Sequence, residues 1–329
     1  MALRTAIEAA AEKMATRQAY GKTLVELGAE NPNLVVMDAD LSKSTMTADF
    51  AKAYPDRFFN MGIAEQNLYA AACGLALSGK VVCASTFAMF AAGRAFEIIR
   101  NSIGYTHANV KICATHAGIT VGEDGASHQT FEDIALMRTI PGMTVINPSD
   151  GASAAELIRQ AMAFEGPAYV RLGRAAVPTF YTKEAAKEIR IGKAATLREG
   201  AKADGGYADI TIIATGIMVS EAMQAAEELA AEHGIEARVI DMHTIKPLDA
   251  EAIVKAAEET GAIVTAEEHS VIGGLGSAVA EVVTTHCPVK MYMVGQQDTF
   301  GESGKPDELK KKYGMTKDDI VKGVLTLRK

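Results

Sequence analysis

No tryptophan occurs among the 329 residues of the chain, and aromatic side chains make up only 6% of it. Basic residues are also few, because 33 Lys and Arg stand against 41 Asp and Glu and leave a net charge of −8. A protein that binds nucleic acid nonspecifically needs a basic stripe or patch. The composition therefore argues against nucleic-acid binding. It does not argue against a phosphorylated metabolite, which needs only local positive charge.

Long apolar runs are absent as well, since Gly, Lys or Glu interrupts each one before the roughly 18 residues that a membrane span requires. The first residues, MALRTAIEAAAEKMATRQ, are helix formers with interspersed charge. They lack the apolar core and the small-residue cleavage site of a signal peptide. These absences predict a cytoplasmic protein that does not associate with membranes.

The four cysteines form no CxxC pair and lie in apolar surroundings; they are Cys73, Cys83, Cys113 and Cys287. Disulfide frameworks and zinc sites have closely spaced cysteines or Cys/His clusters. We therefore expect reduced, buried thiols and no metal ligands in this chain.

What the sequence does contain is an alternation of short β-branched runs with longer helical segments. Strands are predicted at 33–38, 80–86, 110–116, 143–148 and 168–173, and then at 208–216, 236–242, 262–268 and 289–295. Helices are predicted around 17–30, 64–78, 88–102 and 151–164, the last after the capping residues Ser149 and Asp150, and at 220–234, where Gly234 ends the helix.

Near-continuous apolar strands that alternate with helices indicate parallel sheets covered on both faces. The predicted fold class is α/β, with two open parallel or mixed-sheet domains. We place the first domain at 1–180, a polar linker with a small hairpin at 181–205, and the second domain at 206–329. In such sheets, ligands bind beyond the carboxyl ends of the strands.

Acidic, aromatic, histidine and arginine side chains gather just after the predicted strands of the first domain. Taken singly, each has an ordinary explanation: a first-turn carboxylate favoured by the helix dipole, core phenylalanines, loop histidines or surface arginines. The GGLG sequence at 273–276 lacks the second half of a dinucleotide fingerprint, so we interpret it as a point of close helix–strand packing.

Taken together and in order, these motifs resemble the second half of transketolase. The matching segments are ATRQAYGKTL (15–24), DADLSKS (38–44), MGIAEQN (61–67), STFAMF (85–90), THAGITVGEDGASHQ (115–129), PSDG (148–151), RLGR (171–174) and EEHSVIGGLGSAVAE (267–281). The run VGEDGASHQ is highly specific. The resemblance implies an enzyme that transfers a two-carbon ketol unit between phosphorylated sugars, as in the pentose phosphate pathway, with thiamine diphosphate as cofactor.

The resemblance implies that the first domain binds the aminopyrimidine of the cofactor. Glu65 would hydrogen-bond a pyrimidine ring nitrogen and thereby promote loss of the thiazolium proton. Phe87 and Phe90 would form the apolar wall, with Phe87 as the stacking partner, and Asp40 would lie near the thiazolium side. Longer transketolases carry a third aromatic residue where this chain has Gly93, so the pocket is either more open there or filled by another residue.

For the substrate, the resemblance implies that Asp124 bonds a sugar hydroxyl. His128 would bond the carbonyl or hydroxyl next to the reacting carbon, where alkoxide charge develops. Arginine suits a sugar-phosphate anchor because its planar fork meets phosphate oxygens in pairs. The residues that match this anchor are Arg17, Ser44, His116 and Arg174.

Three alternatives fit less well. Deoxyxylulose-phosphate synthase has an acidic residue followed by Arg where this chain has Thr115 and His116, and it lacks the pair Glu123 and Asp124. The β chain of a 2-oxo-acid dehydrogenase handles an unphosphorylated acid and needs no phosphate anchor. A non-catalytic regulatory remnant has no physical need to keep the acids and histidines together.

One family motif is missing from the sequence. The family binds the cofactor diphosphate and Mg²⁺ through Gly-Asp-Gly followed by a helix and Asn, and neither EDG at 123–125 nor ADG at 203–205 replaces it. We therefore expect a partner, an N-terminal transketolase subunit that carries this domain and the magnesium ligands. We also expect self-association and a two-plus-two heterotetramer.

Overall fold

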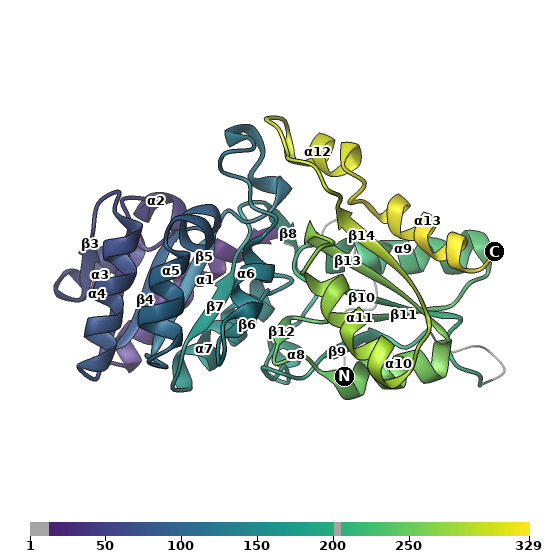
Figure 1. Ribbon diagram of the computed structural model, residues 1–329, viewed down its shortest axis with the longest axis horizontal. Coiled ribbons are helices and arrows are strands. Elements are labelled where there is room, and N and C mark those ends of the chain that lie inside the picture. Colours follow the sequence, from purple (N-terminus) through teal and green to yellow (C-terminus); the bar gives the residue numbers. More distant parts are fainter. Residues whose placement is uncertain (1–12, 201–204) are drawn as a thin grey trace.

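The computed structural model describes residues 13–200 and 205–329, which form two α/β domains lying side by side (Figure 1). The first domain runs from purple to teal in the figure, and the second from green to yellow. Each is built on a largely parallel sheet, so the predicted fold class is confirmed. None of the described helices is long and apolar enough to cross a bilayer.

The sheet of the first domain has the strand order β12-β6-β7-β5-β4-β2-β3. Its neighbouring strands are parallel, except that β12 is antiparallel to β6. The carboxyl ends of the parallel strands therefore meet at one edge. The strands are β2 (Leu34–Asp38), β3 (Phe58–Asn60), β4 (Val81–Phe87), β5 (Val110–Thr115), β6 (Thr144–Ile146), β7 (Ala168–Arg171) and β12 (Thr244–Lys246).

Helices cover both faces of this sheet, which explains its near-continuous apolar strands. Val36 of β2 belongs to the core with α1, α3 and α7, whereas Val35 and Met37 belong to the core with α4 and α6. The predicted capping is confirmed, because the carboxylate of Asp150 accepts the amide of Ser153 at 2.8 Å. The elements are α1 (Thr16–Glu30), α2 (Ser42–Thr45), α3 (Ala48–Ala53), α4 (Glu65–Leu77), α6 (Asp133–Thr139), α7 (Gly151–Ala163) and the 3-10 turns η1 (Pro55–Arg57) and η4 (Ile119–Asp124).

The segment 88–102, predicted as a helix, is helical, but it is interrupted at Ala95 and wound largely as π-helix. It contains the π-helical turn η2 (Phe90–Arg94), the short helix α5 (Phe96–Ile98) and a second π-helical turn, η3 (Ile99–Gly104). The amide of Ala95 bonds to the carbonyl of Phe90, five residues earlier, at 3.3 Å. Such π turns are frequent at functional sites.

The second domain has the strand order β14-β13-β10-β11-β9, in which β9 is antiparallel to β11. Helices α9 and α13 cover one face and α10 and α11 the other, while α12 extends toward the first domain (Figure 1). The bounds are β9 (Ala195–Arg198), β10 (Ile210–Ala214), α9 (Met218–His233), β11 (Ala237–Asp241), α10 (Ala250–Thr260), β13 (Ala262–Ser270), α11 (Leu275–His286), β14 (Lys290–Gln296), α12 (Pro306–Lys312) and α13 (Lys317–Leu327).

The segment 181–205, predicted as a linker, is structured over its described part. It contains α8 (Lys183–Ala186) and β9, and β9 extends the second sheet. The predicted hairpin is reduced to one bridge between Arg190 and Lys193.

A two-stranded ribbon pairs β1 (Lys13–Ala15) with β8 (Ala176–Pro178). β12 lies in the second half of the chain but completes the sheet of the first domain. The boundaries at 1–180 and 206–329 therefore do not separate the two sheets, and they stay a prediction.

Two glycines of GGLG allow the close packing that the sequence predicts. A Cβ on Gly274 would lie 2.0 Å from Glu267 Oε2, and one on Gly276 would lie 2.9 Å from Thr265 Oγ1. The Glu267 carboxylate accepts the amides of Leu275 and Gly276 at 2.6 and 2.7 Å, and its burial raises the pKa of Glu267 to about 7. The motif therefore serves helix–strand packing.

The buried Arg171 pairs with an acid of its own domain and also bonds the second domain. Arg171 donates from Nε to Asp133 Oδ2 at 2.8 Å and from Nη2 to the carbonyl of Glu268 at 2.8 Å. Burial opposes ionisation of Asp133, but the Arg171 guanidinium holds the pKa of this carboxyl below its usual range. The Glu268 carboxylate accepts the amide of Thr120 at 2.6 Å. The second domain thus contacts the loop after β5 directly, through Glu268.

The cysteines are free thiols, three of them buried and Cys287 half-buried.

Asp241 makes the stability of the fold depend on pH. Its Oδ2 accepts the hydroxyls of Ser149 and Tyr181 at 2.6 and 2.9 Å, and burial raises the pKa of Asp241 to about 7. Because this value is above that of the unfolded chain, the protonated carboxyl adds stability below about pH 4 that is lost as the pH rises through 7.

We expect Asp241→Asn, which keeps both acceptor contacts, to flatten this dependence. Between pH 5 and pH 9, the free energy of unfolding of the wild type should fall on the order of 2–4 kcal/mol more than that of the variant. Urea unfolding of both proteins at each pH measures the difference. The contributions of ionisable groups that both proteins share cancel in this comparison. Parallel curves would contradict this prediction.

Candidate functional site

Glu65 is the first residue of α4, where the helix dipole favours a carboxylate. Its side chain is only 2% exposed. Arg94 Nη1 donates to both carboxylate oxygens, at 3.0 Å to Oε1 and 2.9 Å to Oε2. Arg94 was not among the residues predicted from the sequence. The available signal was its place four residues after Phe90, a spacing that puts two side chains on one helical face.

Arg94 ends the π-helical turn η2, and the Cζ of its guanidinium lies 4.7 Å from the centroid of the Phe90 ring. Half of the Arg94 side chain is exposed. The neighbouring Gly93 is exposed too, and a Cβ there would meet the side chain of Met89, whose terminal methyl lies at 2.5 Å. Met89 therefore fills the space beside the position where longer transketolases have an aromatic residue.

The predicted aromatic wall and the two histidines form one cluster. The ring centroids of Phe87 and Phe90 are 5.9 Å apart, and the His116 ring stacks on Phe87 at 3.9 Å. His128 meets the Phe90 ring edge-on at 5.4 Å. Phe87 is 6% exposed whereas Phe90 is only half-buried, so Phe90 presents the more accessible ring.

His116 is an uncharged member of this cluster. Burial, together with Arg17, Arg174 and His128, lowers the pKa of His116 to about 3. Its Nδ1 lies 2.9 Å from the Thr115 hydroxyl. The backbone at His116 has φ 57°, a left-handed conformation that is uncommon for a residue with a side chain. At neutral pH, His116 therefore contributes hydrogen bonding and not charge.

The predicted phosphate anchor brings two guanidinium groups together. Arg17 Nη1 donates to the carbonyl of Ser44 at 2.6 Å, and its buried Nε has no hydrogen-bond partner among the described residues. Burial and then the nearby charge of Arg174 lower the pKa of Arg17. Arg174 Nη1 donates to the carbonyl of Val121 and, at 2.7 Å, to the exposed carboxylate of Glu123. Two like charges and an unpaired donor suit a bound anion.

The two remaining acids lie apart from these contacts. Asp40 is exposed with φ 63° and pairs with Asn60, whose Nδ2 donates to Asp40 Oδ1 at 3.1 Å. Asp124 is exposed at the end of η4. Within 13–200 and 205–329, no hydrogen bond or ion pair joins either acid to the other predicted site residues.

The second domain holds the loop that carries Asp124 and His128. Gln129 Nε2 donates to the carbonyl of Glu302 at 2.9 Å. A Cβ on Gly118 would lie 2.3 Å from Cδ of Glu268, so only glycine fits there at φ 80°. In Figure 1, the segment that leads into α12 reaches this loop at the top of the view. The sequence does not indicate a role for the second domain. The contacts of Gln129 and Gly118 show that one role is to support this loop.

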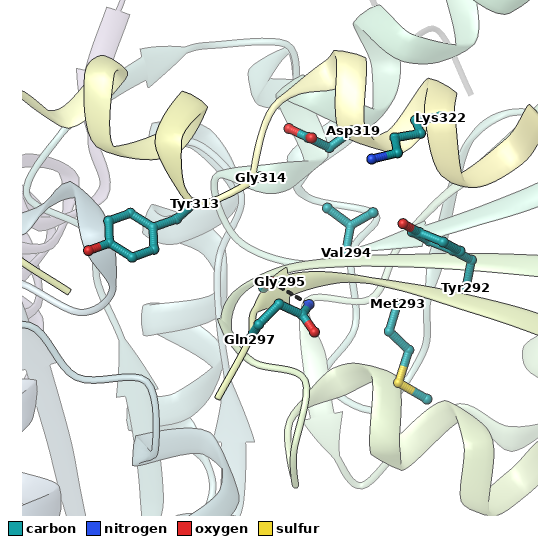
Figure 2. A pocket seen from close by; sticks show the side chains of 9 residues that line it. All are labelled: Tyr292, Met293, Val294, Gly295, Gln297, Tyr313, Gly314, Asp319 and Lys322. Carbon is teal, nitrogen blue, oxygen red and sulfur yellow. Dashed lines mark hydrogen bonds between the residues drawn. The ribbon is translucent and has the colours of Figure 1, made fainter. Parts of the chain in front are cut away.

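A separate cavity of about 370 Å³ lies in the second domain between β14 and α13 (Figure 2). None of the predicted site residues lines it; its lining is Tyr292, Met293, Val294, Gly295, Gln297, Tyr313, Gly314, Asp319 and Lys322. The Asp319 carboxylate already caps α13 through the Thr316 amide and hydroxyl. This cavity therefore does not belong to the candidate site.

One group of three potential metal ligands was found among the described residues. It comprises Glu228, Glu232 and His233 on α9, and Lys317 already pairs with Glu228. It lies in the second domain and contains no predicted site residue.

Comparison with known proteins identifies the family of both domains. Residues 12–179 match the transketolase pyrimidine-binding domain, and residues 192–320 match the transketolase C-terminal domain. The putative transketolase C-terminal section of Methanocaldococcus jannaschii is 52% identical over 310 residues, 94% of this chain and 95% of that protein. One subunit of the apulose-4-phosphate transketolase of Phocaeicola vulgatus is 41% identical over 312 residues, 95% of this chain and 97% of that subunit.

A solved split-gene transketolase, described as an inactive β4 tetramer, is 56% identical to this chain. It superposes with a TM-score of 0.86 over 95% of this chain and 98% of its own. The chain therefore belongs to the transketolase family and corresponds to the C-terminal half of a split transketolase, a pyrimidine-binding domain followed by a C-terminal domain.

Proposed function

We propose that this chain is the C-terminal subunit of a two-chain transketolase that transfers a two-carbon ketol unit between phosphorylated sugars. The observation that carries the proposal is the buried carboxylate of Glu65 at the start of α4, linked through Arg94 to the ring of Phe90, which His128 meets edge-on. A carboxylate that only stabilises the start of a helix can remain exposed to water, whereas Glu65 is buried.

Thiamine diphosphate is the cofactor of the transketolase family, and the residues present fit its aminopyrimidine. Glu65 offers a desolvated acceptor for a ring nitrogen, and Phe87 and Phe90 offer an aromatic wall. Asp40 follows β2 at the carboxyl edge of the same sheet and is proposed to lie toward the thiazolium side. When bound, the cofactor supplies the carbanion-stabilising chemistry. The chain contributes the proton acceptor, the apolar wall and the exclusion of water.

The sugar phosphate is proposed to bind at the paired guanidinium groups of Arg17 and Arg174. His116 and Ser44 add hydrogen bonds without charge. His128, which meets the ring of Phe90, is proposed to bond the oxygen nearest the reacting carbon, where negative charge would develop. Asp124, on the same loop, is the proposed partner of a substrate hydroxyl. The support for a phosphorylated substrate is the buried, unpaired Nε of Arg17.

Activity is proposed to require an N-terminal subunit that holds the cofactor diphosphate and Mg²⁺, in a cytoplasmic heterotetramer that serves the pentose phosphate pathway. The absence of Gly-Asp-Gly from the sequence supports this requirement. So does the similarity, over nearly its whole length, to a protein that is named as one subunit of a transketolase. The β4 tetramer of the split-gene relative supports self-association of this chain when it is alone.

The phosphate anchor is tested by Arg17→Ala and Arg174→Ala in the reconstituted complex. Each loses a charge-assisted contact worth roughly 1.5–3 kcal/mol, so KM for a phosphorylated ketose donor should rise about ten- to hundredfold. KM for hydroxypyruvate, measured with the same unphosphorylated acceptor, should change far less. Lys22→Ala, on an exposed position of α1, is the matched control. Equal losses with both donors would show that these arginines do not hold phosphate.

A further inference from the structure

The carboxylate of Glu65 is already occupied in the chain by itself. Arg94 donates to both of its oxygens, within 3.0 Å, and lies over the ring of Phe90 at 4.7 Å. The Glu65 side chain is 2% exposed and that of Arg94 is 50% exposed. The guanidinium therefore forms the solvent-facing side of this contact and closes the carboxylate off from water.

The chemistry of this contact resembles that of the proposed ligand. A guanidinium is a planar cation whose N–H groups bond a carboxylate while its face stacks on an aromatic ring. An aminopyrimidine that bonds Glu65 through a ring nitrogen and packs on the aromatic wall is also planar and needs the same acceptor. The two groups therefore compete for the same carboxylate, and Arg94 also covers Phe90 of the proposed aromatic wall.

We propose that Arg94 is a latch: in the cofactor-free chain it occupies Glu65, and the aminopyrimidine binds only when the guanidinium leaves the carboxylate. The inference rests on the proposed role of Glu65 in binding the cofactor. A buried carboxylate without a partner is costly, so the empty pocket needs a counter-ion, and Arg94 supplies it. When the cofactor bonds Glu65, the carboxylate no longer requires Arg94 as its counter-ion.

The local structure lets the latch open. Arg94 is half exposed, so its charge can return to water at little cost. Gly93 offers no side chain that would block a swing of Arg94 toward solvent. The backbone can stay in place, because Gln66 Nε2 bonds the carbonyl of Arg94 at 3.5 Å and the π-helical turn is fixed by the Ala95 amide. Opening thus requires side-chain rotation alone.

The first test uses the cofactor-free chain. Arg94→Met removes the counter-ion and should lower Tm by about 2–4 °C. Arg94→Lys, which keeps a cation, should recover most of this loss. Arg100→Met is the matched control, because Arg100 is exposed and its Nη1 bonds Asn101. The loss should shrink in the Glu65→Gln background, where no charge is left to neutralise. Equal losses in both backgrounds would overturn the latch.

The second test measures Kd for Mg-thiamine diphosphate by calorimetry on the complex with the diphosphate-binding chain. Removal of the competitor should tighten binding about tenfold in Arg94→Met and leave Arg100→Met at the wild-type value. If Arg94→Met does not fold, Arg94→Gln gives the same comparison. Unchanged or weaker binding would overturn the latch. If Glu65→Gln binds the cofactor and supports turnover like the wild type, the proposed function fails instead, so the two failures are distinguishable.

Discussion

Replacing Glu65 by glutamine is expected to slow exchange of the thiazolium proton of bound thiamine diphosphate by about 10²–10⁴-fold, the range typical of a lost acid–base group. Glutamine matches glutamate in size and still forms hydrogen bonds. It cannot share a proton with a pyrimidine ring nitrogen, because its amide does not ionise. The effect should therefore appear in the chemistry and not in the fold.

The measurement is quenched-flow hydrogen–deuterium exchange followed by NMR on the complex with the diphosphate-binding chain. Glu97→Gln makes the same chemical change at an exposed position in α5, where Glu97 bonds Asn101, and should leave the rate unchanged. Circular dichroism checks that the Glu65 variant is folded despite the lost partner of Arg94. An unchanged exchange rate in a folded variant would remove Glu65 from the proposed mechanism.

The core of the fold was predictable because its signals are local and repeated. Strands β2, β4 and β5 are runs of apolar residues that only a sheet covered on both faces requires. Asp150 begins α7 with a side-chain cap, and Gly234 ends α9 with φ 63°, as the residue types indicate. Such signals lie within a few residues of the feature that they predict.

The features that were missed depend on contacts between distant segments. β12 is only three residues long and finds its partner β6 about a hundred positions earlier, so no local pattern marks it. β9 lies in a polar segment and joins the second sheet as an edge strand. The π-helical turn at Phe90–Arg94 interrupts a segment whose apolar spacing favours an α-helix.

The candidate site was predictable to a similar extent. The motifs identified the aromatic and histidine cluster, which the structure brings together through β4, β5 and the loop after β5. The sequence did not indicate that Arg94 pairs with Glu65, because its spacing from Phe90 marks only a shared helical face and Glu65 lies 29 positions earlier. Nor did it show that the second domain supports the loop with Asp124 and His128 through Glu268.

The isolated chain is expected to bind thiamine diphosphate weakly or not at all and to transfer no ketol units. Most of the affinity for this cofactor comes from its charged diphosphate, held through Mg²⁺, and the sequence has no Gly-Asp-Gly motif for that purpose. What the chain offers is half a pocket, the wall of Phe87 and Phe90 with the carboxylate of Glu65. Apolar surfaces of this kind mark interaction sites, so the chain should self-associate or pair with its partner.

Calorimetry on the isolated chain with Mg-thiamine diphosphate gives the direct measurement, and no heat of binding at micromolar concentrations is the expected result. Adding the diphosphate-binding subunit should produce ketol transfer that saturates at one partner per chain, because each site needs one pyrimidine domain and one diphosphate domain. Thiamine without its diphosphate serves as the control, and it should bind the complex far more weakly than the full cofactor. Micromolar, magnesium-dependent binding by the chain alone would mean that it holds a complete cofactor site, and the two-chain assignment would then have to be abandoned.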